Sequence, residues 1–274
     1  MALESLQHIR IAQTGGVAWA TIDHPPMNLW DAALTGDLVQ LITGFEADDS
    51  ARVLVLTSAD DEYFIAHADV AMIARLPAEE TAATDAPSPV NQLLERLRLM
   101  PKLSIALVRG IARGGGSEIA LACDLRLATP DARFAQPEVA LGIIPGAGGT
   151  QRLTRLVGRA RALEIVLGCG DVSGEEAAAI GYVNRVVSDD DIEDTVRALA
   201  TRVARLPAHA VAAAKRSVDA AWPDPTPGFI VEGQAFNAAR HDPEAGRLMR
   251  TFLEIGGQTR DAERDVASLL DRLA

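Results

Sequence analysis

Hydrophobic and polar positions follow two patterns along the first two-thirds of the chain. Short apolar runs, as in buried strands, alternate with stretches in which apolar residues recur every three or four positions, as on one face of a helix. The strands predicted in this way span residues 9–13, 17–22, 53–57, 103–108, 124–128, 133–135 and 183–187. Helices are predicted from Asp31, Asp69, Val90 and Ser117, with residues 63–70 as a turn before the second. This alternation predicts an α/β fold.

The pattern changes near residue 190, after which only helical periodicity remains. A proline-rich stretch at residues 222–228 interrupts the helical region. We therefore expect a core over residues 1–190 that carries the active site, and a helical region over residues 191–274. Residues 77–89 are rich in Ala, Pro, Glu and Thr without periodicity, and we expect a surface insertion there.

Charge and composition narrow the possible functions. The formal charge of −12 over 274 residues argues against a nucleic-acid partner, because phosphate neutralisation needs clustered basic residues. Two cysteines, Cys123 and Cys169, are too few for a disulfide framework and lack metal-ligand spacing, so we expect no metal. The scarcity of cysteines leads us to expect a reducing, cytoplasmic compartment, and we expect no membrane partner, since no run approaches about 18 apolar residues.

The first candidate chemistry is a glycine cluster, Gly114–Gly116, which follows a predicted strand and precedes a predicted helix. Backbone N–H groups there can face a ligand oxygen without obstruction by side chains. Residues 63–70 offer a second set of N–H groups at another helix start, and two such donors make an oxyanion hole possible. The alternatives are a tight packing turn at the glycines and an ordinary helix cap at Asp69.

Two acids stand beside these turns. Glu118 follows the glycine cluster, and Glu138 follows Gln136 and Pro137. Each alone is explained as a first-turn partner of a helix dipole. Together with two backbone donors, the acids favour a site that polarises a carbonyl and moves protons next to it.

Three segments carry a family resemblance: residues 64–70 (FIAHADV), residues 109–128, and residues 134–152 (FAQPEVALGIIPGAGGTQR). With them, the chain resembles the enoyl-CoA hydratase/isomerase (crotonase) superfamily. The resemblance implies a spiral of ββα units followed by a helical C-terminal region that forms homotrimers, often paired into homohexamers. It also implies an acyl-CoA thioester substrate and no separate cofactor, because coenzyme A is part of that substrate.

The resemblance assigns roles to individual residues. The N–H groups of Ala68 and Gly115 match the oxyanion-hole donors, and Glu118 and Glu138 match the two catalytic acids of the hydratases. The implied activity is an enoyl-CoA hydratase that adds water across the 2,3 double bond. An enoyl-CoA isomerase, an acyl-CoA hydrolase and a non-catalytic acyl-CoA-binding protein are the alternatives. The implied substrate-binding residues are Ala66, Ala68, Asp69, Val70, Ala71 and Gly115.

Several positions depart from the family pattern. His67 replaces the usual glycine, and we expect a tolerated loop residue there. Arg113 replaces an apolar residue and would either reach a substrate carboxylate or pair with a neighbouring acid. Acids at residues 60–62 and an altered segment at residues 255–260 replace basic residues, so contacts to the coenzyme A nucleotide are expected to differ. Lys215 either approaches a phosphate or lies on a solvated helix face.

Overall fold

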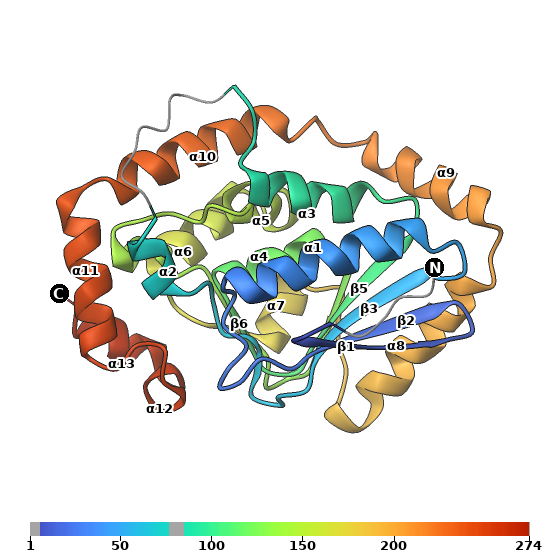
Figure 1. Ribbon diagram of the computed structural model, residues 1–274, viewed down its shortest axis with the longest axis horizontal. Coiled ribbons are helices and arrows are strands. Elements are labelled where there is room, and N and C mark those ends of the chain that lie inside the picture. Colours follow the sequence, from blue (N-terminus) through green and yellow to red (C-terminus); the bar gives the residue numbers. More distant parts are fainter. Residues whose placement is uncertain (1–5, 77–84, 274) are drawn as a thin grey trace.

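The computed structural model describes residues 6–76 and 85–273, and its strands form two sheets (Figure 1). The larger sheet has the order β1-β2-β3-β5-β7-β10, and the smaller has the order β4-β6-β8-β9. The larger contains β1 (Ile9–Thr14), β2 (Val17–Ile22), β3 (Val53–Ser58), β5 (Leu103–Val108), β7 (Leu125–Ala128) and β10 (Arg185–Val186). The smaller contains β4 (Tyr63–Ile65), β6 (Ile111–Arg113), β8 (Arg133–Ala135) and β9 (Val172–Ser173).

Helices connect these strands in the first part of the chain and are the only regular elements after β10 in the part described. The connecting helices are α1 (Ala32–Ala47), α2 (Val70–Ala74), α3 (Pro89–Leu99), α4 (Gly115–Ala122), the 3₁₀ helix η1 (Glu138–Leu141), α5 (Gly149–Val157), α6 (Arg159–Gly168) and α7 (Gly174–Ile180). The C-terminal helices are α8 (Asp189–Ala204), α9 (Ala208–Asp219), α10 (Thr226–Arg240), α11 (Pro243–Glu254), α12 (Arg260–Glu263) and α13 (Val266–Asp271).

Strands come in consecutive pairs that divide between the sheets. In the pairs β3/β4, β5/β6 and β7/β8, the first strand joins the larger sheet and the second joins the smaller. Successive first strands lie parallel, as do successive second strands. Each pair is followed by a helix, so the chain advances by one ββα unit per turn. This is the spiral expected from the resemblance.

The sequence prediction found seven of the ten described strands and missed β4, β6 and β9. All seven predicted strands are present, with ends shifted by two residues at most. The prediction of a turn over residues 63–70 is wrong at its start, because Tyr63–Ile65 is strand β4. β4 and β6 each consist of three consecutive buried residues, which give neither alternation nor a long apolar run.

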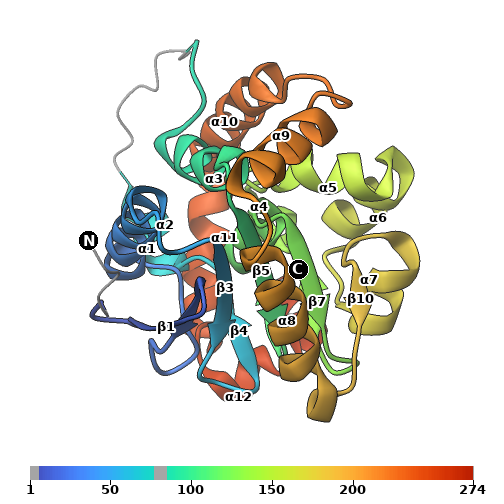
Figure 2. The same ribbon diagram turned by 90° about the vertical axis from the view of Figure 1, so that its right-hand side faces the viewer.

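The core lies on both faces of the larger sheet. One face packs against α1, α3 and α4, with Leu34, Leu94 and Ile119 in the main cluster. The other face packs against α8 (Figure 2), where Ile192 and Val196 are fully buried beside Ile105. The first helix of the C-terminal region is thus part of the sheet's own core.

Two other sequence expectations concern the surface. Of the insertion expected at residues 77–89, residues 77–84 lie outside the described residues, and Ser88 caps α3, which begins at Pro89. None of the described helices is long and apolar enough to cross a membrane.

Two lysine side chains connect the N-terminal ends of β5 and β7 to the helices. Lys102 Nζ donates to the carbonyl oxygens of Phe45 (2.6 Å) and Asp48 (2.8 Å), and burial lowers its pKa. Lys215 Nζ donates to Asp124 Oδ2 (2.8 Å) and to the Lys102 carbonyl oxygen (2.9 Å). Lys215 is therefore held in a packed contact and does not lie on a solvated helix face, and its approach to a phosphate stays a prediction.

Candidate active site

The two backbone donors expected of an oxyanion hole lie side by side. Ala68 follows β4, and Gly115 is the first residue of α4. A Cβ atom built on Gly115 would lie 3.2 Å from the Ala68 nitrogen and 2.6 Å from a carbon of the Trp30 ring. The second distance is shorter than carbon atoms can approach without displacement. Only glycine therefore fits at position 115.

The N–H groups of both residues are available to a ligand. The His67 carbonyl accepts the Trp30 N–H (2.9 Å), which fixes the peptide plane that carries the Ala68 N–H. The Gly115 N–H belongs to the first turn of α4, where an α-helix supplies no acceptor. Within residues 6–76 and 85–273, neither N–H group has a hydrogen-bond partner. Two adjacent free donors can bind an oxygen atom that gains negative charge.

Glu118 lies in the first turn of α4 and is only 3% exposed. Its Oε1 accepts hydrogen bonds from the backbone N–H groups of Ala147 (2.7 Å) and Gly149 (2.8 Å). Burial and the charge of Glu232 raise the pKa of Glu118 to about 8, against the opposing effect of these two N–H groups. Glu118 thus sits in a site that can hold it in either protonation state near neutral pH.

Glu138 is the first residue of η1, and its carboxyl group lies over the start of α4. A Cβ atom on Gly114, whose φ is +45°, would lie 2.6 Å from Glu138 Oε1. In the amide orientation that satisfies both of its ends, Gln136 accepts from Ser117 Oγ (3.2 Å) and donates to both Glu138 oxygens (3.3 Å each). The carboxyl group is therefore held against the glycine cluster.

The two acids titrate as a pair. Burial and the charge of Glu118 raise the pKa of Glu138 well above its usual value. The backbone N–H of Glu138 itself acts to lower the pKa of its carboxyl group, whereas Glu118 accepts hydrogen bonds from two N–H groups, those of Ala147 and Gly149. The two N–H groups on Glu118 favour its ionised form, and burial favours the protonated form of Glu138.

A third buried acid, Glu232 from α10, was not found by sequence reasoning. Its Oε1 accepts from the Gly148 N–H (2.6 Å) and from Asn91 Nδ2 (3.2 Å), and its Oε2 accepts from the Thr150 N–H (3.0 Å). Burial raises its pKa. The only signal in the sequence was an acid within a largely apolar helix, which does not reveal what it faces.

The remaining predicted substrate-binding residues have partners within the fold. Ala66 donates to the Met27 carbonyl and accepts from the Arg113 N–H, so both its backbone groups are paired. Asp69 caps α2, and the Ala71 N–H donates to Asp69 Oδ1 (2.8 Å). Val70 packs in an apolar cluster with residues of η1 and α11. Of the predicted set, Ala68, Gly115, Glu118 and Glu138 lie together around the start of α4 as a candidate site.

The departures from the family pattern pair with one another. Arg113 is fully buried and forms a two-pronged ion pair with Asp171 (2.7 and 2.8 Å), so of its two expected roles it pairs with an acid. Arg260 pairs with Asp60 and Glu62, and Arg264 with Glu62. The acidic residues 60–62 and the altered C-terminal segment thus contact each other through ion pairs.

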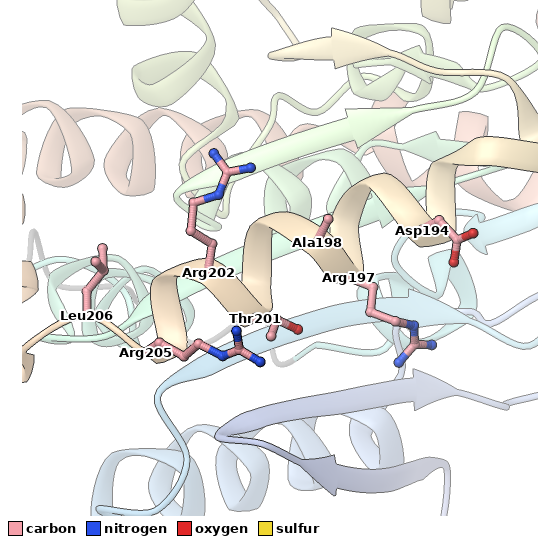
Figure 3. Close-up of a pocket in the computed structure, with 7 residues that line it drawn as sticks. All are labelled: Asp194, Arg197, Ala198, Thr201, Arg202, Arg205 and Leu206. Atoms are coloured by element: carbon pink, nitrogen blue, oxygen red, sulfur yellow. The ribbon is translucent and has the colours of Figure 1, made fainter.

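Among the described residues, the alternatives to this site are a cavity on α8 and any cluster of metal-binding side chains. A cavity of about 660 Å³ lies on α8 and is lined mainly by polar side chains such as Arg197, Thr201 and Arg202 (Figure 3). It contains none of the residues described above and is open to solvent. Among the described residues, no group of three or more His, Cys, Asp or Glu side chains is arranged to hold a metal ion.

The comparisons with known proteins identify the family. The family model described as enoyl-CoA hydratase/isomerase matches residues 12–256. The short-chain-enoyl-CoA hydratase of Clostridium acetobutylicum is 33% identical over 91% of this chain and 95% of its own length. The crotonyl-CoA hydratase of Syntrophomonas wolfei is 35% identical over 80% of this chain and 84% of its own length.

A solved structure gives the same result. A crystallised Streptomyces avermitilis protein, assigned to the enoyl-CoA hydratases, matches with a TM-score of 0.89 and 35% identity, covering 98% of this chain and 99% of its own. The chain belongs to the enoyl-CoA hydratase/isomerase family, and the resemblance seen in the sequence is confirmed.

Proposed function

We propose that this protein is an enoyl-CoA hydratase that adds water across the 2,3 double bond of a 2-enoyl-CoA thioester. The observation that carries the proposal is the pair of coupled acids, Glu118 and Glu138, beside the free N–H groups of Ala68 and Gly115. The names of the relatives in Clostridium and Syntrophomonas support the same activity.

The mechanism follows from the different settings of the acids. The thioester oxygen binds the two N–H groups, which stabilise the enolate that forms as water adds at C3. Two N–H groups favour the ionised form of Glu118, so it orients the water molecule and removes its proton. Glu138 retains its proton and delivers it to C2. The products are the 3-hydroxyacyl thioester and an acid pair that regains its starting state by passing one proton between its members.

The test is a screen of 2-enoyl-CoA thioesters of increasing chain length, with mass-spectrometric detection of water addition. Replacing either acid by glutamine, Glu118→Gln or Glu138→Gln, is expected to reduce hydration by about 100-fold or more, because general acid–base catalysis contributes about 10²–10⁴-fold. Glu254→Gln, at the exposed end of α11, is the matched control and should leave hydration unchanged.

Other outcomes would replace the proposal. Unchanged turnover in either variant would remove the acid pair from the mechanism. Double-bond migration without hydration would indicate an isomerase, and release of free coenzyme A would indicate a hydrolase. Thioester binding without any product would indicate a non-catalytic acyl-CoA-binding protein.

A further inference from the structure

His67, next to the oxyanion donor Ala68, is buried in a network of charges that reaches the C-terminal helices. Its Nε2 lies 2.9 Å from Glu263 Oε1, and its Nδ1 lies 2.7 Å from the Ala68 carbonyl oxygen. Glu263 belongs to α12, which lies with α11 and α13 at one end of the molecule (Figure 1). Position 67 lies in a loop, as expected, but the residue is only 8% exposed and both ring nitrogens have partners, so the side chain is part of the packed interior.

The two partners determine the protonation state of the ring. A carbonyl oxygen and a carboxylate oxygen can only accept hydrogen bonds. Both ring nitrogens must therefore donate, which requires the doubly protonated imidazolium. Burial acts to lower the pKa of His67, but the charge of Glu263 and the two hydrogen bonds outweigh it and raise the pKa above the ordinary 6.5.

The groups around the ring are consistent with a retained positive charge. Glu263 also accepts the Gln258 N–H (3.1 Å), and its pKa is lowered because these contacts and His67 outweigh its burial. Arg113 opposes the charge of His67, but Asp171 pairs with it. The charged groups that act on the ring are Glu263 of α12 and Arg113 of β6, with Asp171 paired to Arg113. Glu138 of η1 lies beyond Gly114, where an added Cβ would be 2.6 Å from Glu138 Oε1 and 3.8 Å from the His67 Cβ. The nearest α11 group is the uncharged ring of Phe252, at 6.0 Å.

We propose that His67 is a positioning residue for the oxyanion hole. Its imidazolium, held between the Ala68 carbonyl and the Glu263 carboxylate, keeps the Ala68 N–H aimed at the thioester oxygen and couples α12 to the active site. This inference rests on the proposed function of the Ala68 and Gly115 donors.

Loss of one proton breaks this arrangement. A neutral ring can donate from only one nitrogen, so the other nitrogen would face an oxygen lone pair. Either the Ala68 contact or the Glu263 contact is then lost, which loosens the loop that carries the Ala68 N–H although its backbone hydrogen bonds to Trp30 remain. Because a displacement of about 1 Å can cost roughly 10²-fold in rate, kcat falls as pH rises through the pKa of His67, while KM changes less.

The first experiment observes the ring itself. In the full-length protein, ¹⁵N-histidine NMR is expected to show both His67 nitrogens protonated at pH 7, with a titration midpoint above about 6.5. Glu263→Gln should move that midpoint to lower pH, because it removes the negative charge that retains the proton. A His67 ring with one unprotonated nitrogen at pH 7 overturns the proposal.

The second experiment observes the oxyanion hole without turnover. The enolate of bound acetoacetyl-CoA absorbs in the near ultraviolet, and its fraction reports how well the two donors stabilise an oxyanion. His67→Gln, whose amide group donates from one end only and accepts at the other, is expected to lower that fraction by about tenfold, by the same positional argument. His209→Gln, on the exposed face of α9, is the matched control and should not. An unchanged enolate fraction in His67→Gln overturns the proposal.

Hydration kinetics separate positioning from a merely structural role. The ratio of wild-type to His67→Gln kcat is expected to be about 10 to 100 at low pH and to approach one above the midpoint found by NMR. Contributions from Glu118 and Glu138 cancel in this ratio, whereas a packing defect would make it independent of pH. Should the wild-type protein hydrate no thioester, the proposed function fails, and the NMR and enolate measurements still decide the role of His67.

Discussion

At the scale of single residues, the site depends on the lack of a Cβ atom at two glycines. Gly114 and Gly115 leave space that the Glu138 carboxyl group and the Trp30 ring occupy. The same absence allows the Ala68 and Gly115 N–H groups to reach one ligand atom. Even a methyl group added at Gly114 or Gly115 would therefore collide with the groups that form the site.

Gly115→Ala tests this directly. The added Cβ would lie 2.6 Å from the Trp30 ring and 3.1 Å from the Ala68 Cβ, so it displaces one of the donors. We expect kcat for enoyl-CoA hydration to fall by about 10²–10³-fold, the usual cost of one oxyanion-hole donor.

Gly36→Ala is the matched control. Gly36 lies on the exposed face of α1, with nothing within 4 Å of its added Cβ. This variant should keep full activity and gain up to about 1 kcal/mol of stability from helix propensity. Full activity in Gly115→Ala would contradict the placement of the oxyanion hole.

The sequence revealed the residues whose chemistry depends on local context. Gly115 and Glu118 follow a strand-to-helix turn that can be recognised from glycines and apolar runs. The roles of His67 and Glu232 could not be predicted, because each depends on a partner far away in the chain. The Glu263 carboxylate contacts His67 from α12, and Glu232 reaches the Gly148 and Thr150 N–H groups from α10.

At the scale of elements, the loop before α5 connects two parts of the active site. Its Ala147 and Gly149 N–H groups donate to Glu118, and its Gly148 N–H donates to Glu232. Alternate N–H groups of one loop thus satisfy two carboxylates from different helices. This arrangement brings two negative charges close together and raises the pKa of Glu118.

Glu232→Gln separates these effects. The amide cannot accept at both of its ends, so the Gly148 or Thr150 N–H loses its acceptor, and the free energy of unfolding in urea should fall by about 1–3 kcal/mol. The charge that raises the pKa of Glu118 also disappears. Since Glu118 acts as a base, the acid limb of kcat against pH should move to lower pH. An unmoved limb would mean that Glu232 does not influence Glu118, and Glu254→Gln again serves as the control.

Prediction of the elements succeeded where periodicity was long enough to detect. The sixteen-residue helix α1 and its cap at Asp31 were expected from apolar spacing. β4 and β6 were not, because three fully buried residues match no period. Their existence follows only from the pairing of β4 with β6 and of β6 with β8 in the smaller sheet, which is a tertiary property.

At the scale of the whole molecule, the C-terminal helices belong to the site as well as to the periphery. α10 supplies Glu232, α12 supplies Glu263, and α11 packs against α2 and η1. Large apolar side chains remain exposed on neighbouring elements, including Leu167 on α6, Val218 on α9 and Val231 on α10. These exposed residues support the proposal that residues 191–274 contribute to association.

Sedimentation equilibrium tests that proposal. The family resemblance leads us to expect a mass of three or six times the 29.0 kDa of one chain. Charged substitutions at two exposed sites, Val218→Glu and Val231→Glu, should lower the mass if these helices form the contacts, since charges are depleted at interface cores. A monomer mass for the unmodified chain at micromolar concentration would exclude the trimer.

The small number of lysines, and their engagement in hydrogen bonds, affect how readily acyl thioesters can modify the protein. Acyl thioesters modify free amines without any catalyst, so a protein that concentrates them exposes its own lysines to damage. Of the 26 lysine and arginine residues, only Lys102 and Lys215 are lysines. The other 24 are arginines, whose guanidinium groups stay protonated. The Nζ atoms of Lys102 and Lys215 both donate hydrogen bonds near the N-terminal ends of β5 and β7. The described chain therefore offers its proposed substrate few lysine amines to acylate.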